Sequence, residues 1–262
     1  MSSAVTVDIV HVVGGIAVGK SSLMERVERD PIAFVAALSS APGFAWLADV
    51  DHASLDLVVV PEVPERWLDK DDGKPLLDRM YAEPAKYAAR FQHAVLNERW
   101  SAMIIKICDT LREHDALPAA KHCPLTHLLL VTDGSIVTDH GVFARACADN
   151  GFMSADEWEA YDTRYSQLAA CWPAKFEAMA RELKLNIRVV LRGTLHLTTP
   201  LAETQTRIRQ RGRDCEQTLP ATYLDDILER HARLLAQPDY SAPPVVAIRD
   251  TPPSGPTPFA VQ

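Results

Sequence analysis

A glycine-rich segment near the N-terminus has the residue types of a phosphate-binding loop. Residues 14–21 read GGIAVGKS and fit the pattern GxxxxGK[ST]. Glycines let backbone N–H groups converge on phosphate oxygens, and the dipole of a following helix adds to the attraction. In such a loop Lys20 reaches the β- and γ-phosphates and Ser21 holds Mg²⁺. The segment therefore predicts ATP or GTP binding by Gly14, Gly15, Ile16, Ala17, Val18, Gly19, Lys20, Ser21 and Ser22.

A carboxylate follows the second apolar run of the chain. Glu62 comes directly after Leu55–Val60 and Pro61, and ligands of open α/β sheets bind beyond such strand ends. A hydroxyl that accepts a phosphoryl group benefits from a base, whereas a phosphate acceptor does not. Glu62 is thus a candidate general base, and a solvated loop carboxylate is the alternative interpretation.

Two further clusters suit nucleotide chemistry. Gln92, Val95 and Arg99 recur at i, i+3 and i+7, so they share a helix face that could frame a base, or that could simply be solvated. Four guanidinium groups fall within seven residues and suit phosphate oxygens, although a basic helix paired with nearby acids is the alternative. These residues are Arg207, Arg209, Arg211 and Arg213, followed by Glu216.

The elements that must position these residues alternate between strands and helices. Such alternation favours a parallel sheet covered by helices on both faces. No internal repeat or linker divides the chain, and the Pro-rich segment 251–262 is predicted to be a flexible tail. Strands are expected at 5–13, 55–60, 128–131, 187–191, 195–197 and 245–248, and helices at 20–28, 84–111, 155–183, 200–211 and 219–235.

Composition narrows the function classes. The 262 residues carry a net charge of −8, which does not favour binding of a nucleic-acid polymer. Apolar runs are interrupted well before about 18 residues, and neither a membrane span nor a secretory signal is expected. Five scattered cysteines without CxxC pairs indicate reduced thiols in a cytoplasmic protein.

Six segments in order resemble the deoxynucleoside kinase family. They read GGIAVGKSS, VPEVPERW, MYAEPAKYAARFQ, DGSIVTDHGVFA, EWEAY and RIRQRGRDCEQTLPATYL, and the resemblance covers about residues 7–250. It implies a single three-layer P-loop kinase domain over residues 1–250. Such a domain has about five parallel strands, helices on both faces and an arginine-rich lid at about 207–217. The resemblance also implies ATP and Mg²⁺ as ligands, a deoxyribonucleoside acceptor and a homodimer.

The resemblance implies a role for each matched residue. Glu62 would be the base for the 5′-hydroxyl, with Lys20, Arg207, Arg211 and Arg213 as catalytic cations. Ser21 and Asp133 would hold Mg²⁺. Asp250 comes just after the last expected strand, in a loop that departs from the family, and is a candidate contact to the base of the donor. Tyr81 and Glu216 would hold the sugar 3′-hydroxyl, and Gln92 would bond the base edge. Phe143 would stack on the base, and the pocket would be completed by Trp67, Phe91, Val95, Arg99 and Asp139.

Two features bear on substrate and catalysis. The charged pair Arg99 and Asp139 suits a ring with an exocyclic amine, so deoxycytidine, deoxyadenosine or deoxyguanosine is favoured over thymidine. Gly134 stands where the family has arginine, and we expect Arg209 or Arg66 to supply that charge. A nucleoside monophosphate kinase remains an alternative, although its acceptor would not need Glu62. A nucleotide-binding pseudokinase is a second alternative because of Gly134.

Overall fold

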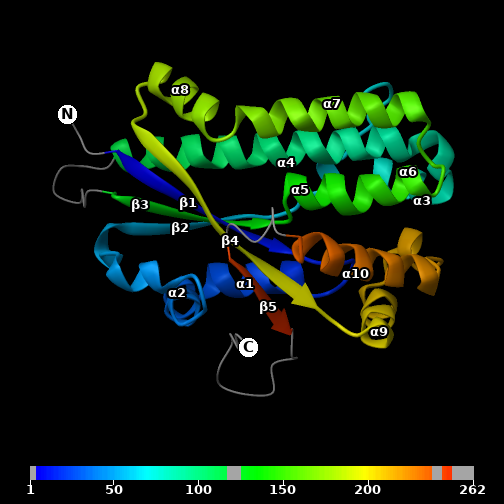
Figure 1. Cartoon of the computed structure of the whole chain (residues 1–262), viewed down its shortest axis with the longest axis horizontal. Coiled ribbons are helices and arrows are strands. Elements are labelled where there is room, and N and C mark those ends of the chain that lie inside the picture. Colours follow the sequence, from blue (N-terminus) through cyan, green and yellow to red (C-terminus); the bar gives the residue numbers. More distant parts are fainter. Residues whose placement is uncertain (1–3, 117–124, 238–243, 250–262) are drawn as a thin grey trace.

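A sheet of five parallel strands forms the centre of the molecule (Figure 1). The computed structural model describes residues 4–116, 125–237 and 244–249. The strand order is β2-β3-β1-β4-β5, with every neighbouring pair parallel. The strands are β1 (Val5–Val13), β2 (Leu55–Val60), β3 (His127–Asp133), β4 (Ile187–Thr198) and β5 (Val245–Arg249). The predicted α/β architecture with about five parallel strands is confirmed.

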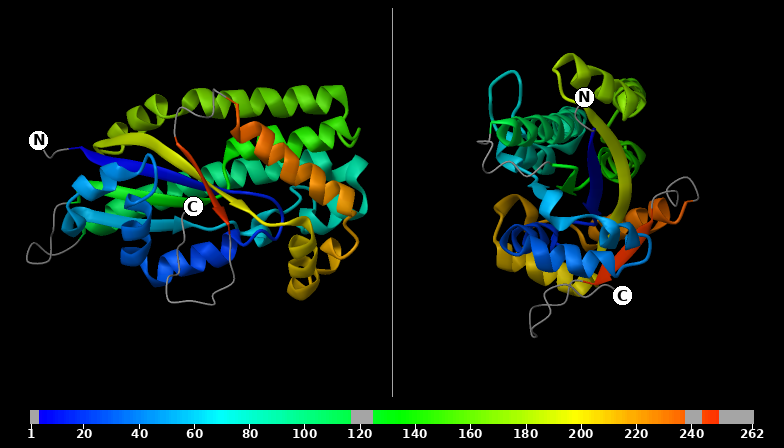
Figure 2. Two further views of the ribbon diagram at one scale, coloured as in Figure 1. Left: turned by 60° about the horizontal axis from the view of Figure 1, so that its bottom comes forward. Right: turned by 90° about the vertical axis from the view of Figure 1, so that its left-hand side faces the viewer.

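Helices cover both faces of the sheet, which gives three layers (Figure 2). One face is covered by α1 (Lys20–Arg29) and α2 (Pro31–Ser39), and the other by α4 (Pro84–Asp115), α7 (Ala155–Cys171) and α8 (Ala174–Glu182). In the part of the chain that the structure describes, five further helices gather towards the carboxyl ends of the strands, where the phosphate-loop motif also lies. They are α3 (Leu76–Ala82), α5 (Ile136–Thr138), α6 (Arg145–Asp149), α9 (Leu201–Arg211) and α10 (Ala221–Leu235).

Successive side chains of β1 alternate between two apolar clusters. Val10 and Val12 pack with residues of α1 and α2, whereas Val7 and Ile9 pack with residues of α4 and α8. Alternation along a strand sends neighbouring side chains to opposite faces. Because both faces are covered, six of the nine residues are apolar and lie on both faces of the strand, so the sequence shows an apolar run interrupted by Asp8 and His11.

The structure corrects two predictions, a helix and a pair of strands, and it shows helix α2 (Pro31–Ser39), which the sequence analysis does not predict. The helix expected at 155–183 is two helices, α7 and α8, because Trp172 adopts an extended conformation before Pro173. The two strand pieces expected at 187–191 and 195–197 are one strand, β4. Helix α2 was not predicted, although Asp30 caps its first turn and Pro31 occupies its first position.

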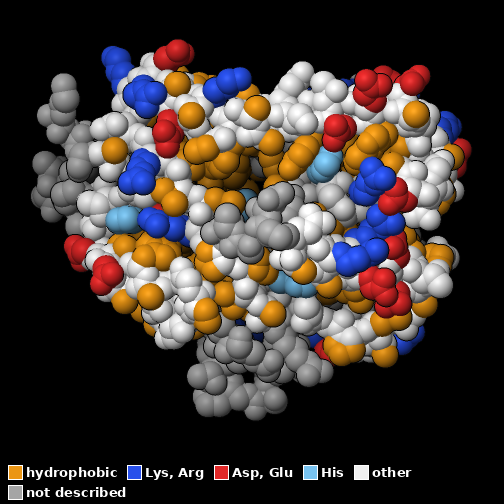
Figure 3. Space-filling view, in the orientation of Figure 1, with side chains coloured by type: hydrophobic (Ala, Val, Ile, Leu, Met, Phe, Trp, Pro, Cys, Tyr) orange, Lys and Arg blue, Asp and Glu red, His pale blue; other side chains and the backbone are white. Residues whose placement is uncertain are grey.

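Several sequence expectations concern the surface and the termini. Among the described residues, no helix is both long and apolar enough to cross a membrane. The thiols of Cys108, Cys147, Cys171 and Cys215 are not in disulfides. Acidic and basic side chains are interspersed on the face shown in Figure 3. The tail at 251–262 and Asp250 lie outside the described residues, so the expectations for them stay predictions.

We predict that a buried histidine pair makes the fold sensitive to acid. His231 is 1% exposed, its ring lies 6.0 Å from that of His196, and its Nε2 has no hydrogen-bond partner among the described residues. Burial lowers the pKa of His231 from 6.5 to about 3. The unfolded chain therefore binds a proton that the folded chain excludes. The stability is fully present above pH 6.5 and is lost progressively as the pH falls towards 3.

His231→Leu tests this prediction, because leucine keeps an apolar group of similar size and removes the proton acceptor. Between pH 7.5 and pH 5 the parent should lose about 2 kcal/mol more unfolding free energy than the variant. Urea unfolding at the two pH values measures the difference. Equal losses in parent and variant would contradict the prediction.

Candidate active site

The carboxyl ends of the strands open onto a cavity of about 770 Å³. Nearly all residues selected from the sequence line it, so segments far apart in the chain meet there. Predicted site residues in its lining are Gly14, Ile16, Ala17, Val18, Gly19, Lys20, Ser21, Ser22, Glu62, Trp67, Tyr81, Phe91, Gln92, Val95, Arg99, Asp139, Phe143, Arg207, Arg211, Arg213 and Glu216. Gly15 and Asp133 lie outside this lining. Asp133 instead lines an adjoining, smaller cavity of about 140 Å³.

The phosphate loop joins β1 to α1 in a tight turn. Gly14 has φ +152°, and a Cβ there would lie 2.5 Å from the carbonyl oxygen of Leu197. Gly19 precedes α1 with φ +105°. The Lys20 ammonium donates to the carbonyl oxygens of Gly14 and Gly15, at 3.2 and 2.9 Å. The loop thus folds around its own lysine at the N-terminus of a helix, which is an arrangement that binds anions.

Asp133 and Ser21 provide oxygen atoms suited to Mg²⁺. The Asp133 side chain is buried, and its Oδ1 has no hydrogen-bond partner among the described residues. Burial raises the pKa of Asp133 to about 6. Glu62 also raises this pKa, whereas Lys20 and a hydrogen bond from Ser21 lower it. A cation next to this carboxylate would relieve the cost of its burial. Mg²⁺ is commonly held by one or two carboxylates together with phosphate oxygens, so this donor set fits the ion.

A largely buried arginine lies at the centre of the acidic residues. The Nη2 of Arg99 donates to Glu62 Oε1 at 2.8 Å, and its Nε donates to Asp139 Oδ2 at 2.6 Å. Its Nη1 donates to the carbonyl oxygen of Asp133. Burial acts to lower the pKa of Arg99, but Asp139 and Glu62 reverse this effect, and the net pKa is raised. Arg99 therefore stays a cation, and it holds Glu62 beside the phosphate-loop side of the cavity.

Aromatic and amide groups line the part of the cavity next to α4. Gln92 is 2% exposed, and its Nε2 lies 3.7 Å from the thiol of Cys147. The rings of Trp67 and Phe91 meet edge-on with centroids 5.3 Å apart, and Phe143 meets His231 in the same manner. One hydrogen-bonding amide among flat apolar groups can accommodate a planar heterocycle.

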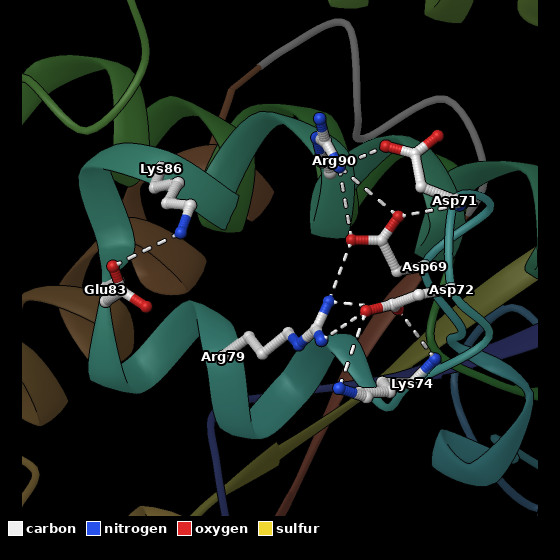
Figure 4. A network of polar contacts seen from close by, with 8 residues as sticks. All are labelled: Asp69, Asp71, Asp72, Lys74, Arg79, Glu83, Lys86 and Arg90. Atoms are coloured by element: carbon white, nitrogen blue, oxygen red, sulfur yellow. Dashed lines mark hydrogen bonds and ion pairs between the residues drawn. The ribbon is translucent and has the colours of Figure 1, made fainter.

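A network of charged residues fixes the wall that carries Trp67 and Tyr81 (Figure 4). Asp69 is buried and accepts hydrogen bonds from Arg79 of α3 and Arg90 of α4, at 3.1 and 3.2 Å. Its Oδ1 also accepts from the backbone N–H of Asp71. These contacts attach the loop after Trp67 to the two helices that carry Tyr81 and Gln92, so the network positions side chains of the cavity without lining it.

The predicted lid contacts both helix α3, which carries Tyr81, and the phosphate loop. Glu216 is 3% exposed and pairs with both Arg211 and Arg213, the latter at 3.4 Å. Arg207 donates to the carbonyl oxygen of Val18 in the phosphate loop at 3.1 Å. Burial, together with Glu216, raises the pKa of the Tyr81 phenol well above its usual value. Tyr81 and Glu216 thus lie near one another, as the predicted contact to one sugar hydroxyl requires.

Some residues of the cavity were not found from the sequence, and two candidates lie elsewhere. Tyr223 of α10 lines the cavity, and nothing in its sequence context predicts this because it depends on where α10 packs.

The two arginines expected to replace the motif arginine have other partners. Arg209 donates to Thr206 within its own helix, and Arg66 pairs with Glu98 at 3.4 Å. In the described part of the chain neither contacts Glu62. The geometry therefore does not support the expectation that Arg209 or Arg66 replaces the motif arginine.

Comparison with known proteins identifies the family. The family model described as "Deoxynucleoside kinase" matches residues 47–251. This chain belongs to the deoxynucleoside kinase family. Family members are phosphotransferases that act on nucleosides with a nucleotide phosphate donor, in agreement with the cavity described above.

The curated relatives are distant. The chain is 25% identical over 171 residues to a deoxyguanosine kinase of Dictyostelium discoideum, a match that covers 65% of this chain and 50% of the relative. It is 26% identical over 179 residues to a probable deoxycytidine kinase of fowlpox virus, with 68% and 61% covered. Deoxycytidine kinase 2 of Gallus gallus is 22% identical over 236 residues, with 85% and 71% covered. The chain thus spans less than two thirds of the length of the first two relatives.

Proposed function

We propose that this chain transfers the γ-phosphate of ATP to the 5′-hydroxyl of a deoxyribonucleoside. The observation that carries this proposal is the presence of Glu62 in the same cavity as Lys20 and the phosphate loop. A carboxylate facing the phosphates has a use when the acceptor is a hydroxyl and none when the acceptor is already a phosphate. Relatives named deoxyguanosine and deoxycytidine kinase support the acceptor class.

The proposal gives each group a task. Glu62 takes the proton of the 5′-hydroxyl as its oxygen bonds to the γ-phosphorus and the bond to the ADP oxygen breaks. Lys20 and the lid residues Arg207, Arg211 and Arg213 spread positive charge around the phosphoryl oxygens, and closure of the lid excludes water. Mg²⁺ held by Ser21 and Asp133 would neutralise charge on the β- and γ-phosphates.

Gln92 and Asp139 favour bases that carry an exocyclic amine. Gln92 can donate and accept at a ring edge, and the Asp139 carboxylate accepts hydrogen bonds only. Both Asp139 oxygens already accept from Arg99, and each has further acceptor capacity, so an amino group on the base can donate to this carboxylate, whereas the thymine carbonyl at that position cannot. We therefore propose deoxycytidine, deoxyadenosine and deoxyguanosine as better substrates than thymidine. The cytoplasmic location and the homodimer stay predictions.

A substrate panel tests the proposed function. ADP release with Mg²⁺-ATP should be seen with the four deoxynucleosides and should be absent with their monophosphates. The kcat/KM for thymidine should be lower than for the three amino-bearing nucleosides, and a preference for thymidine would overturn the proposed selectivity. Turnover of monophosphates alone would make the protein a nucleotide kinase. Nucleotide binding without any turnover would favour a pseudokinase.

A further inference from the structure

The guanidinium of Arg99 occupies the space directly over Gly134. Gly134 follows β3 with φ +84°, a conformation that favours glycine. A Cβ built on Gly134 would lie 2.6 Å from Cζ and 2.8 Å from Nη2 of Arg99, and closer still to Nη1. These distances are too short for any side chain. Arg99 can therefore keep its place only if position 134 has no Cβ.

Arg99 reaches this place from α4, in the adjoining layer, and it is held on three sides. Asp139 accepts from Nε and Nη2 at 2.6 and 3.2 Å, the carbonyl of Asp133 accepts from Nη1, and Glu62 accepts from Nη2 at 2.8 Å. The Asp139 side chain is 3% exposed and the Arg99 side chain 12% exposed, whereas Glu62 is 28% exposed at the edge of the cavity. The two better-buried partners thus fix the guanidinium, and the guanidinium fixes the more exposed carboxylate.

We propose that Arg99 is the positioning residue for Glu62 and that Gly134 is the small residue that makes room for it. The inference rests on the proposed function, because it assigns a role in aligning the base. It also explains the glycine in the segment Asp133–Ser135. A second guanidinium there would need the volume that Arg99 already fills. Asp139 then has a positional role as well, since it holds the arginine that aligns Glu62.

The placement of Arg99 over Gly134 can be tested by chemical rescue. Arg99→Ala leaves a space of guanidinium size over Gly134, beside Glu62 and Asp139. Its kcat for deoxycytidine should fall about 10²-fold, because a misaligned base loses much of the rate that general-base catalysis contributes. Its KM should change far less. Added guanidinium ion should fill the space and raise the kcat of the variant at least about tenfold. This recovery is smaller than the loss of kcat that the substitution causes.

A double variant makes the rescue diagnostic. In Arg99→Ala/Gly134→Ala the new Cβ projects into the space, so guanidinium ion should fail to restore kcat. Arg99→Lys should be intermediate, since an ammonium cannot bridge Glu62 and Asp139 as a planar fork does. Arg112→Ala is the matched control on the same helix, because Arg112 is exposed and pairs with Asp109. Thermal unfolding of each variant checks that it is folded. If Arg99→Ala does not fold, the kcat of Arg99→Lys is the test of the positioning role.

The outcomes separate this inference from the proposed function. Loss of kcat in Arg99→Ala, with guanidinium rescue that the second substitution abolishes, would support it. A kcat within threefold of the parent, or a loss that guanidinium ion does not reverse, would overturn it while leaving the kinase activity in place. A parent protein that phosphorylates no deoxynucleoside would instead overturn the proposed function, and this inference with it.

Discussion

Glu62→Gln is expected to lower kcat for a deoxynucleoside by about 10²- to 10⁴-fold, the range that a positioned general base contributes. Glutamine has the shape of glutamate, and its oxygen can still accept from Arg99 Nη2, which lies 2.8 Å from Glu62 Oε1 in the parent. The amide cannot take up the proton of the 5′-hydroxyl. Steady-state ADP release at saturating ATP and deoxycytidine measures the loss.

Glu65→Gln provides the matched control three residues away. Glu65 is exposed and lies outside the lining of the main cavity, so this variant should keep the kcat of the parent. Binding of deoxycytidine to the Glu62 variant should be nearly unchanged, because the base acts on the hydroxyl proton during transfer. A Glu62→Gln enzyme with a kcat within threefold of the parent would refute the role of general base.

Local sequence patterns predicted the glycine-rich turn between β1 and α1 because its geometry depends on neighbouring residues. Gly14 and Gly19 need unusual φ angles, and Lys20 closes on carbonyls five and six residues away. The strand before the loop and the helix after it are also short-range features. The apolar runs of β1, β2 and β3 also predicted strands, because both faces of this sheet are covered by helices.

The position of Arg99 could not be predicted in the same way. Helical spacing placed Arg99 on one face with Gln92 and Val95, and all three line the cavity. Spacing along a helix does not reveal that the long side chain of Arg99 extends across to Gly134, a residue 35 positions later in the chain. The sequence shows a glycine at position 134 where the deoxynucleoside kinase family has an arginine. It does not show that Arg99 lies over this glycine, because that contact depends on how α4 packs against the end of β3.

The break between α7 and α8 was predictable in principle. Pro173 carries no N–H and disfavours helical conformation in the residue before it, so the helix expected at 155–183 is interrupted there. The observed extended conformation of Trp172 agrees with this rule. By contrast, the approach of Tyr223 to the cavity follows from the packing of α10, which no local pattern encodes.

Asp133→Asn is expected to cause the second large effect, through the metal ion. The buried Oδ1 of Asp133 has no hydrogen-bond partner among the described residues, and Ser21 hydrogen-bonds to the same carboxylate. Asparagine keeps the size of the side chain but removes the negative charge that attracts a divalent cation. The carbonyl that accepts from Arg99 belongs to the backbone and is retained, so the substitution separates the metal from the positioning of Glu62.

We expect kcat at saturating ATP to fall about 10²-fold in this variant, comparable to loss of one charge-stabilising group. The Mg²⁺ concentration for half-maximal rate should rise about tenfold, because ligand charge sets the affinity for hard cations. Titrating Mg²⁺ at fixed ATP measures both quantities, with Asp156→Asn on the exposed surface of α7 as the control. An unchanged Mg²⁺ requirement in Asp133→Asn would show that the ion is held elsewhere. The orphaned carboxylate oxygen would then need another explanation.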